Sequence, residues 1–143
     1  DLVAGGDGGF VHHAGIGGVL GDQLGEGGAI GQLLAQACGT AGQPEDTVDK
    51  LVLTGNTTML YLLTGRDPKC LSHAPFLADT LFGNWATILG KDTYLPACMN
   101  AFVGADITCA VLESGMCRSD DTALLCDLGT NGELALWKDG RLY

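Results

Sequence analysis

Two apolar runs joined by a short glycine-containing turn constrain the fold of this chain more than any other feature. The stretch from Leu124 to Leu136 reads Leu-Leu-Cys-Asp-Leu-Gly-Thr-Asn-Gly-Glu-Leu-Ala-Leu. The first run reaches Asp127, two glycines interrupt the pattern, and a second apolar run follows. This arrangement predicts strand, tight turn and strand. We therefore expect a β-hairpin with strands at 124–127 and 133–137.

The predicted turn places a carboxylate, a hydroxyl, an amide and glycine backbone within a few residues, which suits a phosphate and its magnesium ion. Glycine can adopt positive φ and lets the backbone approach an anion closely. Asp127 is the candidate catalytic carboxylate and the candidate ligand of Mg²⁺, through water. A purely structural hairpin with an Asn-Gly turn is the alternative, although the complete Asp-Leu-Gly-Thr-Asn-Gly-Glu run favours phosphate binding. The further candidate ligand-binding residues of the turn are Gly129, Thr130, Asn131, Gly132 and Glu133.

The Asp-x-Gly-Thr-x-Gly pattern at residues 127–132 resembles the phosphate-binding hairpin of the acetate kinase, sugar kinase, Hsp70 and actin superfamily. Two upstream segments narrow the resemblance. Residues 51–76 include Leu-Val-Leu-Thr-Gly-Asn-Thr-Thr-Met-Leu, Leu-Leu-Thr-Gly-Arg-Asp-Pro and Ala-Pro-Phe, and residues 95–106 include Leu-Pro and Ala-Phe-Val-Gly-Ala-Asp. In this order, with the hairpin last, residues 51–136 resemble the ATP-dependent reductive activators of corrinoid proteins.

The resemblance implies a redox chaperone that passes an electron to the Co(II) state of a corrinoid protein and uses ATP for the uphill step to Co(I). It implies ATP and Mg²⁺ as cofactors, and a [2Fe–2S] cluster in an N-terminal ferredoxin-like domain that this sequence lacks. The implied fold is α/β, with an incomplete RNase H-like sheet and flanking helices. Residues 1–121 would end the first half of one nucleotide-binding domain, and residues 122–143 would open the second half.

The sequence departs from this family plan in three places, and we therefore expect a fragment of a larger protein. The first Asp-x-Gly-Thr hairpin, the ferredoxin domain and any adenosine-binding segment are missing, and the sequence begins at Asp1 without Met. Two other function classes stay open. One is a kinase or chaperone-type ATPase of the same superfamily, and the other is a non-catalytic binding fragment. A four-cysteine iron–sulfur motif upstream would favour the activator.

Residues in two further segments are candidates for the same nucleotide site. Gly55, Asn56 and Thr57 form a predicted strand-to-helix turn, where a helix N-terminus offers free N–H groups to an anion. The simpler interpretation is an ordinary N-cap, worth about 1 kcal/mol. Asp106 lies in the first turn of a predicted helix. It is either a carboxylate placed favourably for the helix dipole, or a catalytic carboxylate acting on Mg²⁺ or water.

Predicted strands separated by helices favour a parallel sheet in an α/β layer. We expect the strand near 51–54 and the hairpin to belong to one mixed sheet, and we expect residues 69–93 to be mostly irregular. The expected elements are a helix at 29–37, a buried strand at 51–53, a helix from Asn56 or Thr57 to Leu63, a short helix near 78–82, a short strand at 95–100 and a helix at 102–113.

The charge balance excludes some partners. The net charge is −10, and seven Lys and Arg residues cannot form a stripe that follows a phosphate backbone, so we expect no nucleic-acid partner. No apolar run approaches the 18 residues of a membrane span, so we expect no membrane partner. The resemblance implies a corrinoid protein as partner, and a homodimer is left open.

The spacing and surroundings of the six cysteines predict that all are free thiols. They form no C-x-x-C motif and no zinc or iron–sulfur spacing, and several lie in apolar contexts, so we expect reduced core thiols in a cytoplasmic protein. A thiol reagent added to the unfolded, unreduced chain should count six thiols. A count of four or fewer would reveal disulfides or a bound metal. The residues are Cys38, Cys70, Cys98, Cys109, Cys117 and Cys126.

Overall fold

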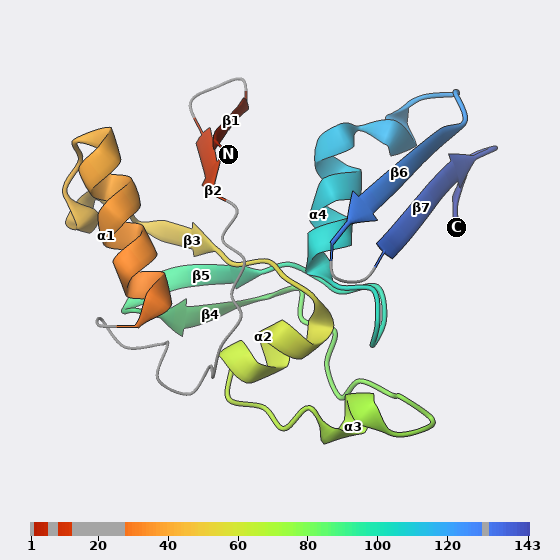
Figure 1. Cartoon of the computed structure of the whole chain (residues 1–143), viewed down its shortest axis with the longest axis horizontal. Helices are drawn as coiled ribbons and strands as arrows, with labels where there is room; N and C mark the ends of the chain where they lie inside the picture. Colours follow the sequence, from red (N-terminus) through yellow and green to blue (C-terminus); the bar gives the residue numbers. More distant parts are fainter. Residues whose placement is uncertain (1, 6–8, 13–27, 130–131) are drawn as a thin grey trace.

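A computed structural model describes residues 2–5, 9–12, 28–129 and 132–143, and in these residues the strands form three separate sheets (Figure 1). The described elements, in chain order, are β1 (Leu2–Gly5), β2 (Gly9–His12), α1 (Ala29–Ala41), the 3₁₀ turn η2 (Glu45–Thr47), β3 (Lys50–Val52), α2 (Thr57–Leu63), α3 (Lys69–Ser72), β4 (Asn84–Ile88), β5 (Lys91–Leu95), α4 (Ala105–Ser114), the 3₁₀ turn η3 (Met116–Arg118), β6 (Ala123–Leu128), β7 (Gly132–Lys138) and β8 (Arg141–Leu142).

The central sheet has the strand order β3-β5-β4. β3 runs parallel to β5, with Val52 opposite Tyr94, and β4 runs antiparallel to β5. Leu89 and Gly90, both at positive φ, make the tight turn between β4 and β5. Two positive-φ residues are what a two-residue hairpin turn requires, because this conformation matches the twist of the strands.

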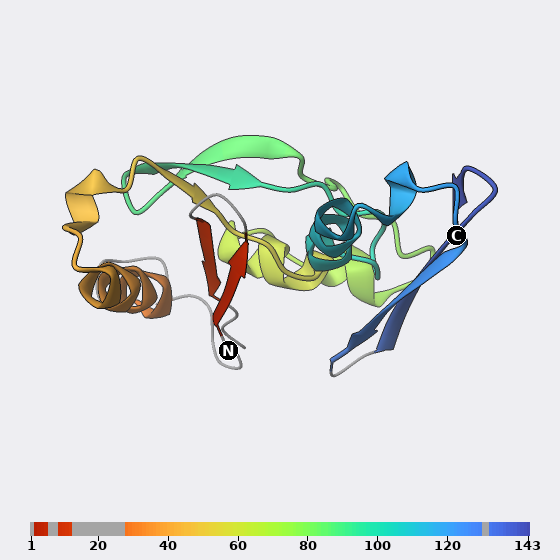
Figure 2. The ribbon, with the colours of Figure 1, turned by 90° about the horizontal axis from the view of Figure 1, so that it is seen from above.

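α1 and α2 cover one face of the central sheet, as Figure 2 shows. Leu60 of α2 and Leu95 of β5 are each 1% exposed, so the contact between α2 and the sheet excludes solvent at these two side chains. The opposite face is open, and Val52 on it is 62% exposed. The core of the covered face consists of Ile30, Leu60, Leu63, Ile88, Leu95, Cys98 and Ala105.

The C-terminal sheet has the order β6-β7-β8 and packs on α4. Ile107 and Val111 of α4 contact Ala135 of β7 in a second core. The indole Nε1–H of Trp137 donates a hydrogen bond of 2.8 Å to the carbonyl oxygen of Ser119. This bond and the apolar contacts fix one face of the hairpin against the helix.

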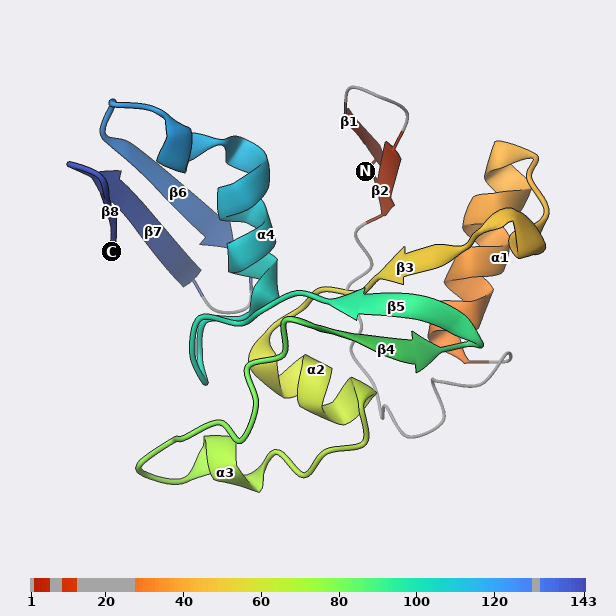
Figure 3. The ribbon, with the colours of Figure 1, turned by 180° about the vertical axis from the view of Figure 1, so that it is seen from behind.

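A third, smaller core surrounds Tyr61, which is completely buried on α2. Its hydroxyl accepts a hydrogen bond from the backbone N–H of Thr80 at 2.9 Å and lies 3.3 Å from the Thr80 carbonyl oxygen, to which it donates. The ring of Phe82 meets the Tyr61 ring edge-on, at 5.7 Å between centroids. These contacts hold the loop after α3, which lies beyond α2 at the periphery of the molecule (Figure 3).

The loop between β3 and α2 touches the start of α4. The Ala105 N–H donates to the carbonyl oxygen of Gly55 at 3.0 Å. Gly104 is buried at this contact, and a Cβ atom on it would overlap the Cα of Asn56. Only glycine allows the two backbones to approach this closely.

The structure confirms the hairpin and the helices after residues 28 and 56, and it corrects other expectations. β3 is not a buried strand, because it lies at an edge of its sheet, Leu51 is only partly buried and Val52 is 62% exposed. Within residues 69–93 the stretch from 73 to 83 is irregular, as expected, but α3, β4 and the start of β5 are regular, and no helix forms near 78–82. β5 ends at Leu95, so 95–100 is not a strand. The hairpin and β3 belong to different sheets.

The last helix begins three residues later than predicted because of Asn100. Its Oδ1 atom accepts hydrogen bonds from the backbone N–H groups of Phe102 (2.7 Å) and Val103 (2.8 Å). A side chain that bonds the backbone ahead of it favours a turn over a helix. Gly104 then serves as the N-cap residue, and α4 starts at Ala105.

The cysteines differ in their surroundings. All six are free thiols, and Cys38 and Cys98 are buried, as expected of core residues. Cys126 is exposed, so the expectation of a core thiol is wrong at this position. Burial raises the pKa of the Cys98 thiol above its ordinary value.

Among the described residues, no helix has the length and apolarity needed to cross a membrane.

Replacing Gly104 by alanine should destabilise the chain by about 1–3 kcal/mol, because the new methyl group forces the α2 and α4 loops apart. Gly39, on α1, is the matched control. A Cβ atom there meets no atom within 4 Å, so Gly39→Ala should stabilise the helix by about 0.8–1 kcal/mol. Urea unfolding of both variants measures these changes. Equal stability of Gly104→Ala and the unchanged chain would contradict the close approach.

The raised pKa of Cys98 makes stability depend on alkaline pH. A folded-state pKa above the unfolded value gives stability that is present below the unfolded value and is lost as the pH rises through the folded value. The urea concentration at the unfolding midpoint should therefore decrease as the pH is raised from about 7 to about 9.5. Cys98→Ala should lower the midpoint at both pH values and flatten its pH dependence. Cys126→Ala, at an exposed thiol, should keep the full dependence.

Candidate functional site

The hairpin positions its two acidic side chains opposite each other. In the β6–β7 register, Asp127 pairs with Glu133, and Leu125 pairs with Ala135. Alternation along the strands places both pairs on the face that packs on α4. Asp127 and Glu133 are each partly buried. The hairpin therefore carries a pair of carboxylates on its inner face, next to the turn.

This carboxylate pair has an energetic consequence. Like charges directly opposite on neighbouring strands are destabilising, by up to about 1 kcal/mol. A divalent cation removes that repulsion, and carboxylate oxygens are the ligands that Mg²⁺ prefers. Across the described parts of the chain, no three His, Cys, Asp or Glu side chains are grouped for metal binding. The described residues thus contribute two carboxylates here, and a Mg²⁺ ion bound by them would keep water or phosphate oxygens as further ligands.

The turn itself is described only at its two ends. Thr130 and Asn131 lie outside the described residues. Gly129 and Gly132 are both exposed. A Cβ atom on Gly132 would meet no atom within 4 Å, and its backbone is not in the left-handed region. The space next to Gly132 is therefore open for a ligand.

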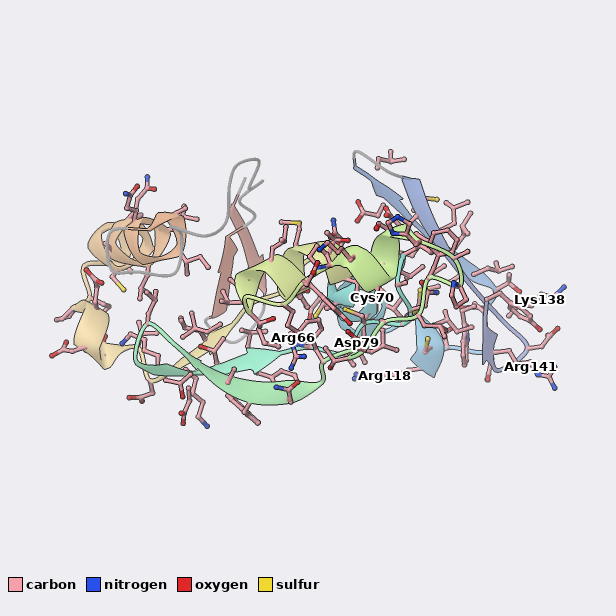
Figure 4. All side chains as sticks on the ribbon, turned by 90° about the horizontal axis from the view of Figure 1, so that it is seen from below. Arg66, Cys70, Asp79, Arg118, Lys138 and Arg141 are labelled. Carbon is pink, nitrogen blue, oxygen red and sulfur yellow. The ribbon has the colours of Figure 1, made fainter. Side chains whose placement is uncertain are left out.

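No cationic side chain belongs to the part of the hairpin near the turn. Lys138 and Arg141 face each other across β7 and β8, at the opposite end of the hairpin. Figure 4 shows these two residues at one end of the molecule, whereas Arg118 of η3 and Arg66, the other labelled cations, lie nearer its middle. An anion at the turn would therefore be bound by backbone N–H groups and a metal ion, not by Lys or Arg from this hairpin.

The second group of candidate residues lies at the junction of α2 and α4. Asn56 is the N-cap of α2, and its Oδ1 atom accepts a hydrogen bond from the Met59 N–H at 2.9 Å. Thr57 is 1% exposed, and its hydroxyl donates to the Asn100 carbonyl oxygen at 2.7 Å. Both side chains thus have structural partners within the chain.

Asp106 shares this junction. Its Oδ1 atom accepts from the N–H of Ile107 at 2.9 Å and would lie 2.7 Å from a Cβ atom on Gly104. Gly55 contributes its carbonyl oxygen to the same contact, as acceptor from Ala105. The structure therefore brings Gly55, Asn56 and Thr57 together with Asp106, which lies 51 positions after Gly55 in the sequence.

Sequence reasoning missed two residues that organise the junction. Asn100 holds the turn before α4 and accepts from Thr57, and Gly104 allows the close approach of the two loops. The close contact at Gly104 is made with Gly55 and Asn56, which are distant in the sequence. The only sequence feature that indicates it is a glycine next to the start of α4. The structure also joins Phe76 and Phe102, from two of the motif segments, with ring centroids 5.3 Å apart.

Comparisons with known proteins agree with the motif resemblance. Residues 27–119 match the family described as the RACo middle region. The corrinoid activation enzyme RamQ of Eubacterium limosum is 32% identical over 124 aligned residues, covering 80% of this chain and 20% of that protein.

A solved structure of a reductive activator for a corrinoid, iron-sulfur protein is also similar. Its TM-score is 0.71 at 30% sequence identity, and the match covers 78% of this chain and 19% of that one. The chain thus spans about one fifth of the length of each relative. The matched family, the relative and the structure point the same way, and the chain belongs to the RACo middle-region family of corrinoid reductive activators.

Proposed function

We propose that this chain supplies part of the nucleotide-binding domain of an ATP-dependent activator that reduces a Co(II) corrinoid protein to Co(I). The observation that carries the proposal is the Asp127–Glu133 pair beside an open, glycine-flanked turn, in a chain of this family. The corrinoid protein is then the partner, in the cytoplasm. The names of the two relatives support the activation of a corrinoid protein, and the donor set of the hairpin supports the nucleotide.

The hairpin residues have defined tasks in this proposal. Asp127 would hold Mg²⁺ through water, and Glu133 would balance the charge of the same ion from the neighbouring strand. Gly129, Thr130, Asn131 and Gly132 would bind the phosphate groups. When bound, Mg-ATP supplies the free energy for the uphill electron transfer. Asp106 would act as a further carboxylate of the cleft, on Mg²⁺ or water. The helix N-terminus at Gly55, Asn56 and Thr57 would offer N–H groups to an anion of the nucleotide.

The electron donor must lie elsewhere in the activator. A [2Fe–2S] cluster needs four thiolate ligands. Cys98 is buried in the core of the central sheet and Cys38 is buried on α1, whereas Cys126 is exposed on the hairpin. The cysteines of this chain do not fit the cluster, so we assign the cluster to a different domain of the longer protein.

The proposed fold context is the RNase H-like arrangement of the actin, Hsp70 and sugar kinase superfamily. Residues 1–121 would belong to one half and residues 122–143 would open the other. One observation supports this division: the central sheet and the hairpin sheet share no strand, and the hairpin sheet starts at β6, directly after the proposed boundary. The core under the hairpin extends across that boundary, because it includes Ile107 and Val111 of α4.

The test is Mg-ATP binding and corrinoid activation by the intact activator, with Asp127→Asn against the unchanged protein. The substitution keeps the shape of the side chain and removes its charge. We expect ATP-dependent activation to fall by about 100-fold or more, with weaker Mg-ATP binding by calorimetry. The isolated chain should bind Mg-ATP weakly, because the opposing wall of the cleft is missing.

Asp139→Asn is the matched control, because Asp139 lies in the β7–β8 turn, at the opposite end of the same hairpin. This variant should bind Mg-ATP and activate the corrinoid protein like the unchanged protein. Equal affinity and equal activation for Asp127→Asn would reject the assigned role and leave the hairpin as a structural turn.

A further inference from the structure

The segment between β5 and α4 contains a turn that closes on the side chain of Asn100. Its Oδ1 atom accepts hydrogen bonds from the N–H groups of Phe102 and Val103, at 2.7 and 2.8 Å. The carbonyl oxygen of Val103 in turn accepts from the N–H groups of Met99 and Asn100, at 2.9 and 3.2 Å. The turn at residues 99–103 therefore takes its shape from bonds within itself, and the Asn100 side chain supplies two of them.

This turn is anchored to α2. The hydroxyl of Thr57, a side chain that is 1% exposed, donates to the carbonyl oxygen of Asn100 at 2.7 Å. Ala101, inside the turn, belongs to the same buried cluster as Tyr61 and Leu71. The turn thus has a fixed place against α2 as well as a fixed shape.

The turn also sets the start of α4. The sequence pattern predicts a helix from residue 102, and in such a helix the N–H of Ala105 would bond the carbonyl oxygen of Ala101. In the structure the Ala105 N–H instead donates to the carbonyl oxygen of Gly55 at 3.0 Å, and α4 begins at Ala105. Because the Asn100 oxygen holds the two N–H groups ahead of it in a turn, α4 does not extend toward residue 102.

Asp106 consequently lies in the first turn of α4, where backbone N–H groups have no intrahelical partner. Its Oδ1 atom accepts from the N–H of Ile107 at 2.9 Å, and in a longer helix that N–H would bond the carbonyl oxygen of Val103. Its Oδ2 atom has no hydrogen-bond partner among the residues that the structure describes. One oxygen thus fixes the carboxylate, and the other is available to a ligand.

We propose that Asn100 is a positioning residue for Asp106, because its side-chain oxygen sets where α4 starts and so fixes the carboxylate of Asp106 for the ATP-dependent step. The proposal rests on the proposed function, in which Asp106 is a carboxylate of the nucleotide cleft. The Asn100 oxygen already accepts two hydrogen bonds, which is its ordinary capacity, so Asn100 acts through the turn rather than on the ligand.

The first test compares Asn100→Ala with Asn100→Asp in the intact activator. Asn100→Ala removes the acceptor, so amide hydrogen exchange at Phe102 and Val103 in the nucleotide-free protein should become about 10-fold faster or more. The maximal rate of ATP-dependent activation should fall by about 10- to 100-fold. Asn100→Asp keeps the accepting oxygen and should restore both properties. Unchanged exchange in Asn100→Ala, or no rescue by Asn100→Asp, would overturn the proposal.

A double-mutant cycle tests whether Asn100 acts through Asp106. Asp106→Asn alone should lower activation, and adding Asn100→Ala to it should lower activation by less than about threefold more, because the group being positioned is already lost. Losses that multiply would overturn the proposal, and so would full activity of Asp106→Asn. The role of Asp127 stands or falls separately, on Mg-ATP binding by Asp127→Asn.

Tyr61→Phe is the matched control for stability. It removes a buried hydroxyl that bonds the backbone of Thr80, on the same helix that anchors the turn. Like Asn100→Ala, it should lower the melting temperature of the intact activator, by about 2–4 °C. At a temperature where both variants are folded, Tyr61→Phe should keep activation within about twofold of the unchanged protein. Equal losses of activation in Tyr61→Phe and Asn100→Ala would assign both to stability and overturn the proposal.

Discussion

The close contact between Gly104 and the Gly55–Asn56 backbone is the constraint on which the rest of the structure depends. It sets the start of α4 directly against the loop that ends β3 and begins α2. Ala105, the first residue of α4, then belongs to the core of the central sheet, whereas Ile107 and Val111, less than two turns further on, belong to the core under the hairpin. One short helix thus connects two sheets that share no strand, and a displacement at Gly104 would reach both cores.

The junction explains why candidate residues far apart in the sequence lie together. Asn56 caps α2, Thr57 donates to the carbonyl oxygen of Asn100, and the side chain of Asn100 shapes the turn that leads to Gly104. The Thr57 hydroxyl is paired at a buried site, where an unpaired group costs about 1–3 kcal/mol. Asn56, Thr57 and Asn100 therefore have structural roles at this junction, and a ligand that bound here would meet side chains whose positions these hydrogen bonds already fix.

Local elements could be predicted from the sequence, and non-local pairing could not. The hairpin is defined by a continuous pattern from Leu124 to Leu136, and the N-cap of α2 is defined by Asn56 itself, so both were predicted correctly. β4 and β5 were missed, because their register depends on Trp85 meeting Tyr94 and on contact with α2. The assignment of β3 to the sheet of the hairpin failed for the same reason, since sheet membership is decided by α4. At the site, the pair Asp127–Glu133 follows from the hairpin register, whereas the contact at Gly104 does not.

The charged side chains of the hairpin limit the kind of anion that could bind near its turn. None of the seven Lys and Arg residues lies between Ala123 and Trp137, and the inner face presents two carboxylates beside the turn. A free phosphate brought to this place would meet negative charge from Asp127 and Glu133. A phosphate carried with a divalent cation would instead bring the charge that the pair needs, and the backbone N–H groups of the turn would remain for its oxygens. In the proposed function this arrangement would favour a metal-bound phosphate over a bare one, with the cation, rather than a basic side chain, as the link between protein and ligand.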